Sequence, residues 1–69
     1  MNEQHKYTVQ TNELKTFSKI EDAIAFAKEQ PKAIVFADCE YAIVGYFYGH
    51  IEWALHGWFR KNNINMSIL

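Results

Sequence analysis

The sequence has a single cysteine, Cys39, so no disulfide bond can form within the chain. One free thiol is typical of a protein from a reducing compartment. The first nine residues, MNEQHKYTV, contain no apolar run of the kind that a secretory signal peptide requires. We therefore expect a cytoplasmic location.

The chain also lacks any block of like charge. Seven Lys and Arg residues stand against eight Asp and Glu residues, which gives a formal net charge of −1. A protein that holds duplex DNA by counterion release, or one that mimics a polyanion, needs a larger imbalance. No Gly-rich phosphate-binding loop, serine nucleophile motif or redox cysteine pair occurs. Catalysis is therefore not expected of this chain.

Sixty-nine residues suffice for one small domain, residues 1–69, which buries only about 60% of the surface that its unfolded chain exposes. Yet 49% of the residues are hydrophobic and 16% are aromatic. Such a domain carries more apolar surface than it can enclose without a disulfide or a metal. We expect part of this surface to be covered by a second copy or by a partner.

Seven of the eleven aromatic residues lie between positions 41 and 59. Odd positions of this stretch are apolar or Gly and even positions are mixed, which is the period of a half-buried strand. The alternation predicts a hairpin of strands 41–47 and 51–59 joined by a three-residue loop. In this register Gly45 faces Trp53, whose ring covers the bare glycine backbone.

A helix over residues 50–61 is the competing interpretation of the same stretch. Its apolar side chains recur at helical spacing, at Ile51, Ala54, Leu55, Trp58 and Phe59. Gly57 opposes this interpretation, because glycine in mid-helix costs about 1 kcal/mol relative to Ala. Neither interpretation excludes the other on sequence grounds.

The stretch is also long enough to span a membrane, and Gly45 and Gly49 have the spacing of a membrane helix-packing motif. However, His50, Glu52 and His56 lie within it, and a carboxylate near the bilayer centre is costly. We therefore expect no membrane-spanning segment.

The rest of the chain divides into short elements. Alternation predicts strands over residues 6–11 and 14–17, and the apolar run 33–37 predicts a central strand. The chain ends, residues 1–5 and 65–69, are expected to fray, unless the C-terminal tail adds an edge strand.

A helix is predicted over residues 18–30. Ser18 and Glu21 have the spacing of a capping box at its start, and Pro31 ends it. Its inner stripe consists of Ile20, Ala23, Ile24 and Ala27.

Candidate metal ligands and catalytic residues are few. On a strand His50 and His56 would lie about 20 Å apart, too far to share an ion, and on a helix they lack the i, i+4 spacing of a zinc-binding pair. Cys39 lies between Asp38 and Glu40, whose charges disfavour the thiolate that a nucleophile needs. We therefore predict no metal site, no catalytic residue and no cofactor.

On the hairpin interpretation, large rings share the even-numbered face with polar and charged groups. Aromatic side chains and Arg among polar neighbours are enriched at protein interfaces. The predicted partner contacts are Tyr46, Tyr48, Trp58 and Arg60, with His50, Glu52 and His56 at the rim. If residues 50–61 are helical, Trp53 replaces Tyr46 as a candidate contact.

We predict an α+β domain in which a mostly antiparallel sheet of three to five strands carries the 18–30 helix on one face. The function that the sequence favours is that of a small non-enzymatic protein that binds a larger protein and modulates or inhibits it stoichiometrically. The abundance of Asn, Ile, Lys, Phe and Tyr is compatible with an AT-rich genome, and hence with a phage or plasmid origin.

Two other functions stay open. The same rings could stack single-stranded nucleic acid, although the cationic track that such a protein needs is limited to Arg60 and Lys61. Alternatively, the chain is a structural homodimer with no separate ligand site.

Overall fold

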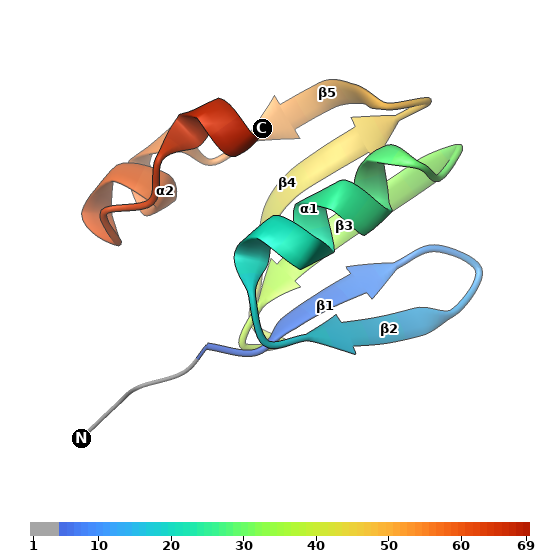
Figure 1. Ribbon diagram of the computed structural model, residues 1–69, viewed down its shortest axis with the longest axis horizontal. Coiled ribbons are helices and arrows are strands. Elements are labelled where there is room, and N and C mark those ends of the chain that lie inside the picture. The colour runs from blue at the N-terminus through green and yellow to red at the C-terminus, as the bar shows by residue number, and fades with distance from the viewer. Residues whose placement is uncertain (1–4) are drawn as a thin grey trace.

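The computed structural model describes residues 5–69, which form a five-stranded antiparallel sheet of strand order β2-β1-β3-β4-β5. Helix α1 connects β2 to β3 and lies across one face of this sheet (Figure 1). The elements in chain order are β1 (Tyr7–Gln10), β2 (Leu14–Phe17), α1 (Ile20–Lys28), β3 (Lys32–Ala37), β4 (Tyr41–Phe47), β5 (His50–Ala54), α2 (His56–Lys61) and the 3-10 helix η1 (Met66–Ile68). The prediction of an α+β domain with one helix on one face of the sheet is confirmed.

Strand β3 is the central strand, as predicted, because it pairs with β1 on one side and with β4 on the other. Tyr7 and Val9 of β1 lie opposite Ala37 and Val35 of β3, and all four are buried on the α1 side. The period-two pattern of both segments therefore places one apolar row under the helix.

Helix α1 buries the predicted stripe, Ile20, Ala23, Ile24 and Ala27. It ends at Lys28, ahead of Pro31. The predicted capping box is wrong, because the N-cap residue is Lys19 and no side chain caps the first turn. Since β2 keeps Phe17 paired in the sheet, Ser18 and Lys19 must carry the chain onto the sheet face, and Ser18 lies one residue too early to cap.

Each interpretation of residues 41–59 is correct in part. The chain pairs with β4 as far as Ala54, and after Leu55 it continues as α2. Gly45 faces Trp53 as predicted. The hairpin loop has two residues rather than three, Tyr48 and Gly49, whose φ angles of 51° and 81° are typical of a tight hairpin turn.

A β-bulge in β4 inverts the predicted faces of the strand. Ile43 and Val44 are consecutive and both fully buried, and the register with β3 shifts at this point. Beyond the bulge the even positions face the core, so Tyr46 is 0% exposed whereas Phe47 is 50% exposed. One inserted residue moves every later side chain to the other face. The prediction that Tyr46 is an exposed contact is therefore wrong.

Helix α2 and the C-terminal tail complete the cover on the α1 side of the sheet. Phe59 of α2 is fully buried, and Ile64, Ile68 and Leu69 pack against the core. The tail therefore forms no edge strand and its last residues are packed. Fraying was also predicted for residues 1–5. Residues 1–4 lie outside the described residues, and His5 forms a hydrogen bond with Asp38.

The opposite face of the sheet carries no helix from the described part of the chain (Figure 1). Side chains that alternate with the buried ones point to this side, which we call the open face. It consists of Thr8, Gln10, Leu14, Thr16, Lys32, Ile34, Phe36, Ala42, Gly45, Phe47, His50 and Trp53.

Candidate functional site

The densest group of exposed large hydrophobic side chains lies on the β4–β5 hairpin. Within residues 5–69 eight large hydrophobic side chains are exposed, and five of them fall between positions 47 and 55. These five are Phe47, Tyr48, Ile51, Trp53 and Leu55. Single exposed hydrophobic residues are ordinary, but a cluster of this density marks a candidate interaction site. We call residues 47–55 the aromatic hairpin.

The aromatic hairpin presents its side chains in two directions. Phe47 and Trp53 belong to the open face. Ile51 pairs with the buried Tyr46 and therefore lies on the α1 side of the edge strand β5. We group Ile51 with two other exposed side chains, Tyr48 at the turn and Leu55 directly after β5, and call these three residues the hairpin border.

The turn of the hairpin is held against the α1–β3 connection. The amide of Tyr48 donates a hydrogen bond of 2.8 Å to the carbonyl of Pro31. Gly49 lies so close to the same segment that a Cβ atom there would be 3.2 Å from the carbonyl oxygen of Lys28. The rings of Phe47 and Tyr48 pack edge to face with centroids 4.6 Å apart. These contacts fix the orientation of the tip, so its exposed surface is preformed.

Trp53 lies directly on the backbone of Gly45. An ideal Cβ at position 45 would be 2.6 Å from Nε1 of Trp53, a distance that only glycine avoids. The ring therefore covers the gap that the missing side chain leaves in the open face, as the sequence pattern predicted.

Three of the predicted contacts, Tyr48, His50 and Glu52, are exposed on the aromatic hairpin. Three others lie on α2, beyond the end of β5 that is remote from the turn (Figure 1): His56, Trp58 and Arg60. His56 and Arg60 are exposed, whereas Trp58 is half-buried and packs edge to face on Phe59 at 5.2 Å. The structure thus divides the predicted site between the two ends of β5.

Tyr46, the seventh predicted contact, belongs to the core. Its hydroxyl is buried without a hydrogen-bond partner in the described part of the chain. Burial raises the pKa of Tyr46 to about 12, because the phenolate would lose its hydration.

Sequence reasoning missed Phe47, Ile51 and Leu55 as exposed residues. The strict alternation placed them on the inner face of the hairpin. The adjacent branched residues Ile43 and Val44 are the local signal that could have indicated a bulge, since both are apolar in an otherwise alternating strand.

The polar contacts at the other end of the sheet hold the β3–β4 turn. Nδ1 of His5 donates to Oδ2 of Asp38 at 2.7 Å, and the amide of Lys6 donates to Oδ1 at 3.1 Å. These hydrogen bonds lower the pKa of Asp38, and the bond from His5 is the larger cause. The nearby Cys39 thiol lies 3.2 Å from the hydroxyl of Thr8 and not against His5. The His5–Asp38 pair thus acts as a structural clamp between the residues before β1 and the β3–β4 turn.

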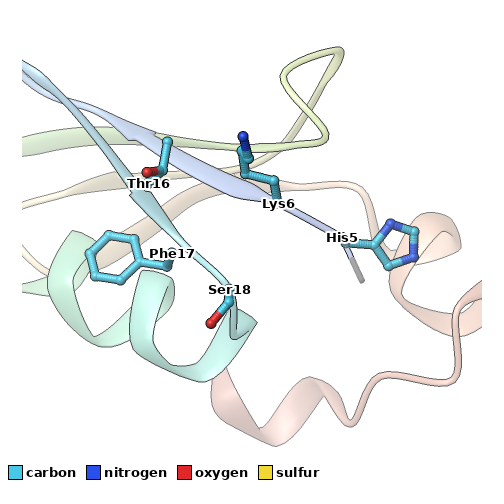
Figure 2. A pocket seen from close by; sticks show the side chains of 5 residues that line it. All are labelled: His5, Lys6, Thr16, Phe17 and Ser18. Atoms are coloured by element: carbon cyan, nitrogen blue, oxygen red, sulfur yellow. The ribbon is translucent and has the colours of Figure 1, made fainter. Parts of the chain in front are cut away.

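A shallow depression of about 270 Å³ lies where β1 begins and β2 ends. It is lined by His5, Lys6, Thr16, Phe17 and Ser18, and Figure 2 shows their side chains spreading away from one another. Reactive groups must converge on one point to act on a substrate. The five side chains that line this depression do not converge in this way.

Across residues 5–69, no three His, Cys, Asp or Glu side chains are placed to hold a metal ion. None of the helices in that range has the length and apolar character needed to cross a membrane. Comparison of the chain with protein-family models, with characterised proteins and with solved structures found no match.

Proposed function

We propose that this protein is a small non-enzymatic binding module that docks on a larger protein through the hairpin border. The observation that carries the proposal is the concentration of five of the eight exposed large hydrophobic side chains, among residues 5–69, in positions 47–55. On the hairpin border Tyr48 is 66% exposed, and Ile51 and Leu55 are each 45% exposed. Full burial of such side chains contributes about 1.5–3 kcal/mol each, so three anchors can dominate an interface.

The polar groups beside these anchors support a protein partner. His50 and Glu52 flank Ile51, as polar rim groups flank the apolar centre of a protein interface. A protein that binds single-stranded nucleic acid needs a line of cations beside its rings. Glu52 places a negative charge among the exposed rings, and only two cations, Arg60 and Lys61 of α2, follow the hairpin in the chain. The charge pattern therefore favours a protein over nucleic acid.

The proposed action is stoichiometric, by blocking or recruiting the larger protein. A chain of 69 residues whose described side chains form no convergent reactive group is suited to binding rather than to turnover. The proposal includes a phage or plasmid origin and action in the cytoplasm, both of which are compatible with the amino-acid composition.

Two matched variants test the hairpin border. Leu55 is 45% exposed and Leu14, on the far edge strand β2, is 70% exposed, so either leucine can be replaced by Glu without burying a charge in the monomer. Tagged wild type, Leu55→Glu and Leu14→Glu are used to capture proteins from lysate of the source cell, with and without nuclease. We expect wild type and Leu14→Glu to retain the same dominant protein. Leu55→Glu should lose it, since a carboxylate in the apolar centre lowers affinity by about 100-fold, or 2.7 kcal/mol.

Equal capture by Leu55→Glu and wild type would refute the hairpin border as the docking site. Recovery that disappears with nuclease would instead support the nucleic-acid function. Circular dichroism of the three proteins establishes that they share one fold.

A further inference from the structure

Glu52 is the one formally charged residue between positions 41 and 59. Its side chain is exposed in the middle of β5, and the register with β4 skips it, so no residue of β4 lies opposite. The single ion pair among residues 5–69 joins His5 to Asp38. Glu52 therefore has no cationic partner within the described part of its own chain.

The aromatic hairpin surrounds this carboxylate with exposed apolar side chains. Ile51 and Trp53 adjoin it in the chain and are 45% and 36% exposed, and Leu55 follows at 45%. At about 3.3 Å per residue, Ile51 and Leu55 are no more than about 13 Å apart. A partner surface of standard size, about 800 Å², is roughly 30 Å across. A partner that covers both of these anchors must therefore also contact Glu52.

This requirement rests on the proposed function, in which a larger protein docks on the hairpin border. A carboxylate that loses water on docking destabilises the complex unless the partner offers a positive charge or hydrogen-bond donors in its place. A cation does so most strongly, because hydrogen bonds between ionised groups are shorter and roughly twice as strong as those between neutral groups. We propose that the larger protein presents a lysine or arginine side chain to Glu52, within an apolar surface that receives Ile51 and Leu55.

The same carboxylate disfavours two other occupants of this surface. β5 is an edge strand, and two copies of it paired about a two-fold axis through its middle would place the two Glu52 side chains opposite each other. Like charges in opposite positions destabilise a pair of strands. A nucleic acid would bring its phosphates toward Glu52 and meet the same repulsion. The charge of the hairpin therefore favours a cationic protein surface.

The experiment compares two substitutions of Glu52 with a matched substitution elsewhere. Glu52→Gln removes the charge and retains the shape of the side chain, whereas Glu52→Lys reverses the charge. Glu13→Gln is the control, because Glu13 is exposed in the β1–β2 turn and its replacement changes the net charge as Glu52→Gln does. The larger protein captured on immobilised wild type is purified, and its dissociation constant for each variant is measured by titration calorimetry at about 50 mM and about 300 mM NaCl.

We expect Glu52→Gln to raise the dissociation constant about tenfold at the lower salt concentration, and Glu52→Lys to raise it about 100-fold, because the partner's cation then meets no charge or a like charge. Glu13→Gln should bind as wild type does. The higher salt concentration should weaken the binding of wild type severalfold and that of Glu52→Gln much less, since ions screen the charge pair that Gln cannot form. Circular dichroism checks that all variants share one fold, as expected for exposed positions.

Equal affinities of wild type and Glu52→Gln at the lower salt concentration would overturn the proposal, as would tighter binding by Glu52→Lys. Failure of the proposed function has a different signature, which is equal capture of the larger protein by wild type and Leu55→Glu. A wild type that captures no protein, and whose self-association in sedimentation equilibrium tightens as salt rises, would overturn both, because two like-charged copies would then occupy the surface.

Discussion

Tyr46→Phe perturbs a buried polar atom that the described fold leaves without a partner. The ring is 0% exposed, and its hydroxyl accepts and donates no hydrogen bond within residues 5–69. An unpaired buried hydroxyl costs about 1–3 kcal/mol, whereas Phe retains the whole ring. We expect the variant to be more stable than wild type at pH 7 by about 1 kcal/mol.

The same substitution should alter the response of stability to alkaline pH. Burial raises the pKa of Tyr46 from 10.0 to about 12. The pKa of Tyr46 is therefore higher in the folded chain than in the unfolded chain. Below pH 10 the tyrosine is neutral in both states, and its ionisation does not affect the free energy of unfolding. Between pH 10 and 12 the unfolded chain ionises first, so the free energy of unfolding falls as pH rises. A difference of two pKa units corresponds to at most about 2.7 kcal/mol.

Urea denaturation followed by circular dichroism, at pH 7 and between pH 9 and 12, measures both effects. Wild type should lose stability across pH 10–12, and Tyr46→Phe should lose less of it. Burial also raises the pKa of Tyr7, so a smaller slope should remain in the variant. Tyr41→Phe, at a tyrosine that is 57% exposed, is the matched control and should be neutral at pH 7. A Tyr46→Phe protein that is less stable than wild type, or equally pH-sensitive, would refute the argument.

Two further substitutions test the contacts made at Gly45 and at Asp38. Gly45→Ala places a Cβ 2.6 Å from Nε1 of Trp53, so the indole ring must move. We expect the free energy of unfolding to fall by about 1–3 kcal/mol and the tryptophan emission to shift to the red. If both quantities are unchanged, the contact between Trp53 and Gly45 is contradicted. Asp38→Asn removes the carboxylate that His5 holds at 2.7 Å, while Asn accepts the left-handed φ of 56°. Since the pKa of Asp38 is lowered from 3.8, its stabilisation is present above that pH and is lost as pH falls further. The side chains of His5 and Asp38 are 38% and 44% exposed, so solvent screens the pair and the loss is below about 1 kcal/mol. A difference from wild type that does not shrink below pH 4 would refute the clamp.

The secondary structure could be predicted from the sequence wherever periodicity alone decides it. The stripe from Ile20 to Ala27 and the stop at Pro31 predict α1 because they depend only on neighbours along the helix. Alternation in Tyr7–Gln10 and the apolar run at Ala33–Ala37 likewise predict β1 and β3. The division of residues 50–61 into strand and helix could not be predicted, because it depends on tertiary pairing: β5 stops opposite Val44, at the bulge, although β4 itself extends to Tyr41.

The candidate site could be predicted only in part, for a different physical reason. The concentration of rings between positions 41 and 59 correctly located the region, and Tyr48, His50 and Glu52 are exposed there. The assignment of side chains to faces failed, because strict alternation is valid only while each residue of β4 opposes one residue of its neighbour. Tyr46 and Phe47 exchanged places for this reason.

The bulge in β4 also accounts for the second register shift, in β5. With Gly45 opposite Trp53, an unbroken ladder would place Glu52 opposite Tyr46, which the first bulge has turned into the core. A carboxylate in that position would lie against the buried apolar ring of Tyr46 and lose part of its hydration. The second bulge leaves Glu52 out of the pairing and sets Ile51 beside Tyr46 instead. Glu52 thereby remains in solvent between Ile51 and Trp53, and the two bulges together create the two directions in which the aromatic hairpin presents its side chains.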